Sequence, residues 1–102
     1  MAQVKVAEID EIPDGKVKRV LVKRQPIAIF NCGGTFYAIG DTCSHAEASL
    51  AQGQLLGGCK VACPLHGAQF DLKTGEALTF PAVTPVESYP VTLSGTSILL
   101  EV

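Results

Sequence analysis

Short apolar runs separated by turn residues recur along this chain at intervals of about ten residues. In several of these runs apolar and polar side chains alternate, which is the pattern of strands with one buried face. Many short strands at such a spacing are typical of a β-sandwich or a β-barrel. No segment has the period of a long amphipathic helix. We therefore predict an all-β fold of antiparallel strands.

The first two predicted strands are residues 3–9 (QVKVAEI) and 16–23 (KVKRVLVK), with a turn at residues 13–15 (PDG) between them. Proline presets φ for such a turn, and glycine accepts a positive φ. In the second strand the alternation of apolar positions slips at Lys18 and Arg19. The slip predicts a β-bulge or a place at the edge of a sheet.

Two hairpins are predicted further along the chain. Residues 26–30 and 35–39 flank NCGG, whose Asn and Gly residues tolerate a tight reversal. Residues 86–93 and 97–102 flank SGT, and we expect this last hairpin to pair with the opening strands. The two ends of the chain would then build an antiparallel β-sandwich base, from residues 1–40 and 82–102.

Residues 41–81 differ in amino-acid composition from the predicted base. Glycines, small side chains, cysteines and histidines dominate there, with short strand-like pieces at residues 54–57, 60–63 and 68–72. We predict that this segment is a ligand-binding subdomain inserted into the base. The 102 residues would thus form one domain with two parts.

Charge and hydropathy narrow the function classes. Eight Lys and Arg against ten Asp and Glu give a net charge of -2, which predicts no nucleic-acid and no membrane-surface partner. No apolar run is long enough for a membrane span, and the first residues lack the apolar stretch of a secretory leader. We therefore expect a cytoplasmic protein. A reducing compartment favours metal ligation over disulfides for clustered cysteines.

Two short motifs carry the candidate chemistry. The first reads C-x-H and the second C-x-x-H, with seventeen residues between them. Each motif offers one thiol and one imidazole, so two loops facing each other would surround a metal centre with approximate two-fold symmetry. The candidate ligands are Cys43, His45, Cys63 and His66.

Other interpretations of these four residues remain open on spacing alone. Isolated cysteines and histidines are often plain buried residues. A structural zinc site is the main competitor, although its usual order is a cysteine pair followed by a histidine pair. The chain lacks both C-x-x-C-H, the haem attachment motif, and C-x-x-C, the thioredoxin motif. A catalytic Cys/His pair would leave the second motif unexplained.

With this order and spacing the motifs resemble those of the Rieske [2Fe-2S] family, and the resemblance extends along most of the chain. It implies the Rieske fold, with a cluster-binding subdomain, and one [2Fe-2S] cluster as cofactor. It also implies that Cys43 and Cys63 bind the inner iron. His45 and His66 would bind the outer, more exposed iron.

This ligand set has an electrostatic consequence. An oxidised cluster core with two thiolates and two neutral imidazoles is neutral overall, whereas four thiolates would leave it with two negative charges. Adding an electron to a neutral object costs less Coulomb work, above all at low dielectric constant. The reduction potential should therefore exceed that of all-cysteine ferredoxins. The added electron should reside on the histidine-bound iron.

Two positions indicate which branch of the family the chain resembles. Respiratory Rieske proteins carry an additional cysteine in each cluster loop and join the two as a disulfide, but the matching positions here are Ala48 and Leu65. The chain instead resembles small Rieske-type ferredoxins of bacterial aromatic-ring oxygenase systems. Their clusters lie near the lower end of the roughly -150 to +300 mV Rieske range.

The resemblance implies a one-electron carrier and not an enzyme. A flavoprotein ferredoxin reductase that uses NAD(P)H would donate to it, and a terminal Rieske non-haem iron oxygenase would accept from it. We expect a monomer that forms transient complexes. Two alternatives stay open: a permanent small subunit of a reductase, of the nitrite reductase type, and a zinc-braced interaction module.

The sequence also allows predictions for the two cysteines outside the motifs, for one proline and for four acidic residues. Cys32 and Cys59 lie outside both motifs, and we expect them to be free thiols without a role in metal binding. Pro81 lies in a segment that resembles the proline loop covering the cluster in this fold, and a plain connecting segment is the open alternative. We also consider an acidic rim beside the cluster that would face a basic partner, although scattered surface carboxylates more often serve only solubility. Its candidate members are Asp41, Glu47, Asp71 and Glu76.

Overall fold

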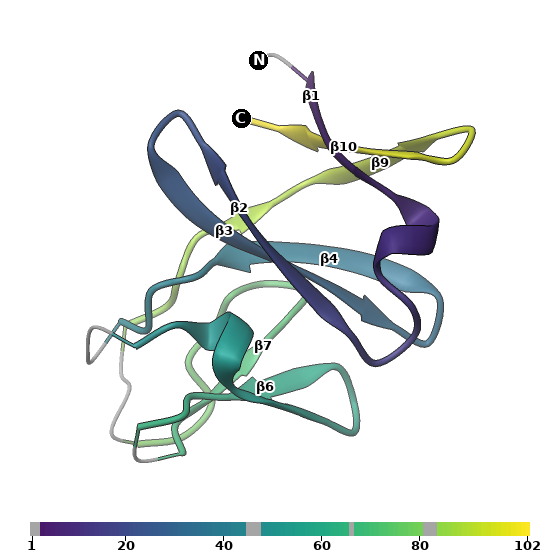
Figure 1. Ribbon diagram of the computed structural model, residues 1–102. Helices are drawn as coiled ribbons and strands as arrows, with labels where there is room; N and C mark the ends of the chain where they lie inside the picture. The colour runs from purple at the N-terminus through teal and green to yellow at the C-terminus, as the bar shows by residue number, and fades with distance from the viewer. Residues whose placement is uncertain (1–2, 45–47, 66, 81–83) are drawn as a thin grey trace.

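The computed structural model describes residues 3–44, 48–65, 67–80 and 84–102. These residues form ten strands in three antiparallel sheets, with two short 3-10 helices (Figure 1). The predicted all-β antiparallel class is therefore confirmed. Among the described residues, no helix is long and apolar enough to cross a membrane.

The first sheet joins the two ends of the chain. Strand β1 (Gln3–Glu8) pairs with β10 (Ser97–Glu101), which pairs with β9 (Val91–Ser94). The last hairpin thus returns to the opening strand, as predicted, and both termini lie at the same end of the molecule (Figure 1). The register of β1 against β10 shifts between Lys5 and Ala7, so a bulge lies here and not in the second strand.

The second sheet has the order β2-β3-β4-β8. Its strands are β2 (Val17–Val22), β3 (Gln25–Cys32), β4 (Thr35–Gly40) and β8 (Ser88–Tyr89). Strand β2 pairs with β3 in an unbroken register and forms one edge of this sheet. The slip in its alternation therefore reflects an edge position, where outward side chains reach water.

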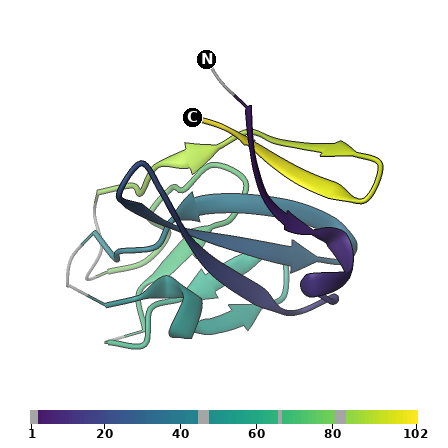
Figure 2. The ribbon, with the colours of Figure 1, turned by 45° about the horizontal axis from the view of Figure 1, so that its top comes forward.

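This second sheet is the middle layer of the molecule (Figure 2). Four consecutive side chains of β3, residues 27–30, are buried, and they alternate between two hydrophobic clusters. Ile27 and Ile29 pack with β1 and β10, whereas Ala28 and Phe30 pack with the inserted segment. Burial on both faces explains why the apolar run of β3 is continuous and not alternating.

The third sheet belongs to the inserted segment. It consists of β5 (Gln54–Leu56), β6 (Lys60–Ala62) and β7 (Gln69–Asp71), in that order. The side chains of Val61 and Phe70 are buried in the cluster that contains Phe30. The 3-10 helix η2 (Leu50–Gln52) precedes β5, and η1 (Ile9–Glu11) follows β1.

The expectation of free thiols at Cys32 and Cys59 is wrong, because the two residues form a disulfide with a Cα–Cα separation of 5.8 Å. Cys32 ends β3 and Cys59 lies in the turn before β6. The bond therefore joins the middle sheet to the sheet of the inserted segment. Sequence reasoning missed the pairing because the two cysteines are 27 residues apart and share no motif.

Candidate metal centre

The first motif lies in a loop that is closed by its own backbone. The chain leaves β4 at Gly40, and a β-bridge between Thr42 and Ser49 forms the neck of the loop. The Cys43 N–H then donates a hydrogen bond of 2.9 Å to the carbonyl oxygen of Ala48. Cys43 is thus held at the neck of the loop.

The second motif has the same closure. Cys63 directly follows β6, and its N–H donates a hydrogen bond of 2.7 Å to the carbonyl oxygen of Ala68. The donor and the acceptor are five residues apart in both loops. Gly67, inside the second loop, has φ of +69°, a left-handed conformation that favours glycine. The two halves of the motif therefore place their cysteines in equivalent local positions.

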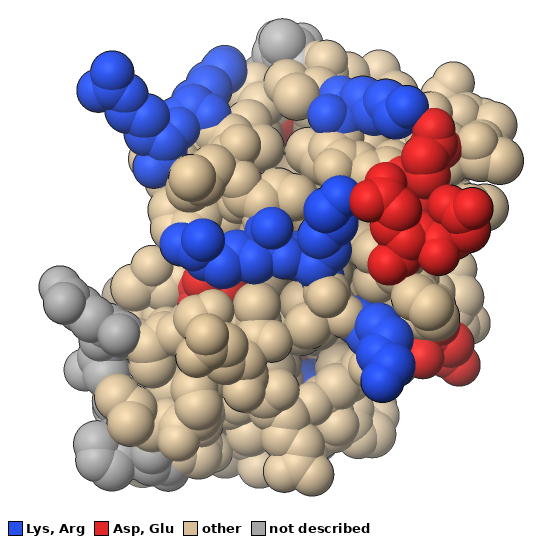
Figure 3. Space-filling model, viewed as in Figure 1, with Lys and Arg blue, Asp and Glu red and all other residues tan. Residues whose placement is uncertain are grey.

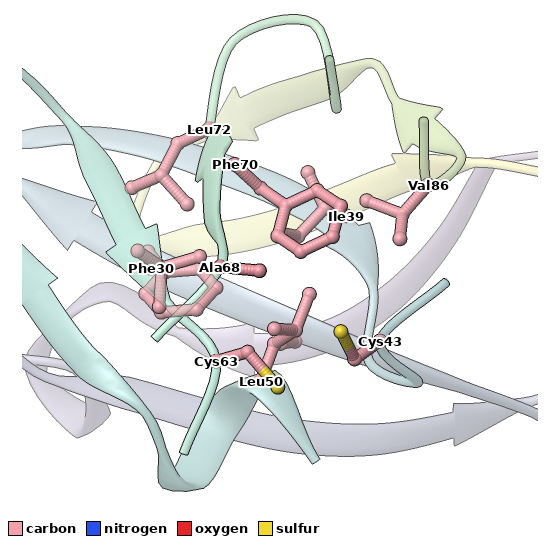
Figure 4. Close-up of a cluster of buried hydrophobic side chains, with 11 residues drawn as sticks. Phe30, Ile39, Cys43, Leu50, Cys63, Ala68, Phe70, Leu72 and Val86 are labelled. Atoms are coloured by element: carbon pink, nitrogen blue, oxygen red, sulfur yellow. The ribbon is translucent and has the colours of Figure 1, made fainter. Parts of the chain in front are cut away.

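Both cysteine side chains are buried against the core of the inserted segment. Cys43 is 3% exposed and Cys63 is 2% exposed, and both lie outside disulfides. They belong to the same cluster of buried side chains as Leu50 and Ala68, and lie along one margin of the group drawn in Figure 4. Buried thiols at equivalent points of two loops suit a shared ligand between those loops.

The other two candidate ligands, His45 and His66, lie outside the described residues, as do Pro81 and Glu47. The part of the chain that the structure describes accordingly contains no group of three metal-binding side chains. The described segments that flank residues 45–47, 66 and 81–83 lie at the same side of the molecule (Figure 1).

Asp41 is not part of an acidic rim, which corrects the expectation from the sequence. Its side chain is 3% exposed and accepts hydrogen bonds of 2.9 Å from Arg19, Ser49 and the Ala51 N–H. A scattered carboxylate is normally expected at the surface. The three donors that make burial possible come from distant positions, so the sequence carries no local signal for them.

The stems of the two loops touch at Gly53. A Cβ atom at this position would overlap the carbonyl oxygen of Ala62, the residue before Cys63. A second link joins the first loop to the segment after residue 83, because the Ser44 hydroxyl donates a hydrogen bond of 2.5 Å to the Thr84 carbonyl. Glycine is therefore required at residue 53 by the close approach of backbone and not by its φ of -81°.

Two exposed apolar side chains lie in the second loop and in the segment after β7. Leu65 is 48% exposed and Phe80 is 83% exposed. Phe80 follows Thr79, whose hydroxyl accepts a hydrogen bond of 2.9 Å from the Gln69 N–H beside the loop. On the face shown in Figure 3, acidic side chains gather near η1 and basic ones lie over β2, while the inserted segment is mainly uncharged.

Residues 2–90 match the family described as the Rieske [2Fe-2S] domain. The chain therefore belongs to the Rieske [2Fe-2S] family, and its cofactor is one Rieske-type [2Fe-2S] cluster. The described part of the site fits this cofactor, since two buried cysteine side chains lie at equivalent loop necks. The structural and sequence relatives narrow the assignment within the family.

The chain is 43% identical over 101 residues to the 3-phenylpropionate/cinnamic acid dioxygenase ferredoxin subunit of Escherichia coli strain K12, covering 99% of this chain and 94% of the relative. The structure matches the ferredoxin of carbazole 1,9a-dioxygenase from Nocardioides aromaticivorans IC177 with a TM-score of 0.93 and 36% identity, over 98% and 97% of the two chains.

A ferredoxin bound to its oxygenase is also similar. The complex of reduced oxygenase and oxidised ferredoxin in carbazole 1,9a-dioxygenase contains a chain that matches with a TM-score of 0.89 and 32% identity, over 96% of this chain and 91% of that one. These relatives are electron-transfer components of dioxygenase systems, and the resemblance to Rieske-type ferredoxins is confirmed.

Proposed function

We propose that this protein carries single electrons from a flavoprotein reductase that uses NAD(P)H to a terminal Rieske non-haem iron oxygenase acting on aromatic rings. The observation that carries the proposal is the pair of buried thiols at matching loop necks, in a chain similar to dioxygenase ferredoxins over nearly its whole length. It is an electron-transfer component and not itself an enzyme.

The proposed ligands are two cysteines and two histidines, Cys43, His45, Cys63 and His66. Cys43 and Cys63 hold the inner iron, and their burial keeps water away from the sulfur side of the site. His45 and His66 would hold the outer iron, and their imidazoles would also be the exit route for the electron. The bound cluster supplies reversible one-electron chemistry, and the mixed ligand set places its potential above that of all-cysteine clusters.

Partners dock at the end of the molecule that carries the two ligand loops. Electron transfer needs a short path, and Leu65 and Phe80 give this end exposed apolar area. Such a small, mainly apolar contact suits a transient complex. A Phe80→Gln variant should raise the KM of the oxygenase for this protein as electron donor and leave the reduction potential of the variant unchanged.

The chain works as a single domain in the cytoplasm, where NAD(P)H is available to the donor. Its base comprises residues 1–40 and 82–102, and its cluster-binding lobe comprises residues 41–81. The separate sheet formed by β5, β6 and β7 supports this division. We expect a monomer between encounters, because a carrier must leave its donor before it meets its acceptor.

The decisive experiment is single-turnover electron delivery. The protein, reconstituted with iron and sulfide, is reduced by NADH or NADPH through a flavoprotein ferredoxin reductase and mixed with an oxidised Rieske oxygenase. We expect an electron paramagnetic resonance spectrum of a reduced Rieske cluster, which is replaced by the spectrum of the oxygenase's own reduced Rieske cluster as one electron per chain moves to the oxygenase. Reduction without any transfer to Rieske oxygenases would contradict the proposal.

Two other outcomes identify the alternatives. Purification with a partner in fixed stoichiometry would indicate a permanent reductase subunit. A colourless protein that contains zinc and no acid-labile sulfide would indicate a zinc-braced module. Substitution of a ligand gives a further check: His66→Cys adds a thiolate and should markedly lower the potential of any cluster that assembles.

A further inference from the structure

Asp41 occupies an unusual place for a charged side chain. It is 3% exposed and lies two residues before Cys43, at the neck of the first ligand loop. Carboxylates are rarely buried unless they are paired and hydrogen-bonded. Its burial therefore requires a specific set of partners.

Three donors from two segments meet this carboxylate. Its Oδ2 accepts a hydrogen bond of 2.9 Å from the Arg19 Nε on β2. Its Oδ1 accepts two more of 2.9 Å, from the Ser49 hydroxyl and from the Ala51 N–H. Ser49 is the residue that bridges to Thr42 across the neck. The carboxylate thus fastens the outgoing stem of the loop to the incoming one.

The backbone of Asp41 also forms hydrogen bonds, and we call the whole set of hydrogen bonds at Asp41 the clamp. Its N–H donates to the Pro26 carbonyl at 3.0 Å, and its carbonyl accepts from the Leu50 N–H at 2.7 Å. Asp41 therefore contacts β3, η2 and, through Arg19, the edge strand β2. Every polar group of this residue connects the first ligand loop to a rigid element.

We propose that Asp41 is a positioning residue for the cluster and that its charge lowers the reduction potential. The inference rests on the proposed function, because it assumes that Cys43 is a ligand. The clamp fixes the loop neck at Cys43. The same clamp keeps one negative charge in a water-poor place close to the cluster.

The sign of the electrostatic effect follows from Coulomb's law. An electron added to the cluster is repelled by a nearby negative charge, and the repulsion grows as the local dielectric constant falls. Arg19 offsets part of this repulsion, but its side chain is 50% exposed and is screened by water and salt. The buried carboxylate therefore dominates, and the two charges should act in opposite directions.

The test compares three single variants of the reconstituted protein in redox titrations followed by circular dichroism. Asp41→Asn keeps the shape and one acceptor oxygen, and should raise the midpoint potential, corresponding to up to about a tenfold change in the equilibrium constant, or about 59 mV for one electron. Arg19→Gln should lower the midpoint by a smaller amount. Asp14→Asn is the matched control.

Asp14 suits this role because its exposed carboxylate also accepts a backbone hydrogen bond, from the Gly33 N–H at 2.8 Å. Gly33 lies in the turn at the opposite end of β4 from Asp41. The substitution removes the same charge, and we expect the midpoint potential to stay at the wild-type value.

A purely structural role would not reverse the sign of the shift between Asp41→Asn and Arg19→Gln. Equal potentials in all variants, or shifts in one direction for both, would overturn the inference. If Asp41→Asn takes up no cluster, Arg19→Gln decides: a lowered midpoint supports the inference and an unchanged one rejects it. A wild-type protein that shows no Rieske spectrum would instead reject the proposed function.

Discussion

The two ligand loops have the same closing hydrogen bond but are held by different means. The neck of the second loop continues into paired strands, because Ala62 of β6 lies opposite Gln69 of β7. Beyond Thr42 and Ser49, the neck of the first loop has no strand pair in the described residues, and the Asp41 side chain connects its stems. One loop is thus supported by backbone ladders and the other by a side-chain network.

The loops also differ in how they are joined to the middle sheet. The first loop reaches β2 through the Arg19–Asp41 ion pair. The sheet of the second loop reaches β3 through the Cys32–Cys59 disulfide, at the end of β6 away from Cys63. A backbone ladder tolerates many side chains, whereas a side-chain network depends on each member. Substitution of a single side chain should therefore disturb the first loop more than the second.

The largest effect should come from removing the disulfide. A Cys32→Ser/Cys59→Ser double variant should lose about 3.5 kcal/mol of unfolding free energy, from the chain entropy of a cross-link between residues 27 apart. The quantity is measured by denaturant unfolding of the cluster-free chain. Hydrogen exchange should increase in β5, β6 and β7 but not at the Asp41 neck.

Chemical reduction gives the matched control for that variant. A reductant converts the wild-type disulfide to two thiols. Wild type with reductant should approach the stability of the double variant, and the double variant itself should not respond. Unchanged stability in both cases would show that the strand pairs hold the second loop without the cross-link.

The sequence predicted most of the strands, but it did not predict the disulfide and the ion pair that join the two loops to the middle sheet. Short apolar runs and turn residues correctly predicted the hairpin of β3 and β4, because Gly33 and Gly34 adopt the positive φ that the turn needs. The tight turn between β2 and β3 was not recognised, since Lys23 and Arg24 occupy positive φ without a glycine. Long-range pairs such as Cys32 with Cys59 leave no local pattern at all.

The contact between the loop stems provides the next largest effect. Gly53→Ala should cost about 3 kcal/mol, because the new methyl group would overlap the Ala62 carbonyl oxygen and force backbone to move. Such a shift separates the two cysteine positions, so the variant should also take up less iron and sulfide. Iron content and denaturant unfolding measure the two consequences.

Gly57→Ala is the matched control for this substitution. Gly57 lies in the turn after β5, and a Cβ there meets no atom within 4 Å. We expect near wild-type stability and a full cluster. If both alanine variants behave alike, the stems do not depend on close backbone approach, and the two loops are less tightly coupled than the structure indicates.

A smaller effect is expected at the side-chain contact of the second loop. Thr79→Val removes the hydroxyl that accepts the Gln69 N–H, and water can replace it at this exposed position. The loss should be about 0.5 kcal/mol. Faster hydrogen exchange at the Gln69 amide is the sensitive measurement, and Thr79→Ser should retain protection. A large loss would mean that the second loop also depends on individual side chains.

The smallest effect concerns an exposed ion pair on the strand that carries Arg19. The Lys18 Nζ lies 2.6 Å from Glu11 Oε2, and this hydrogen bond, with one from the Glu8 N–H, lowers the pKa of Glu11 below its ordinary value of 4.5. Exposed pairs contribute little, so Glu11→Gln should leave stability at neutral pH nearly unchanged.

The pH dependence of unfolding separates this exposed pair from the buried one. Because the folded-state pKa of Glu11 is lowered, its contribution is present above 4.5 and is lost as pH falls through the lower folded value. Denaturant unfolding across that range should show a slightly shallower acid loss in Glu11→Gln than in wild type. A large change in stability at neutral pH would show that an exposed ion pair on β2 stabilises the protein as much as the Arg19–Asp41 pair. The buried network at the first loop would then have no special role compared with the backbone pairing of the second loop.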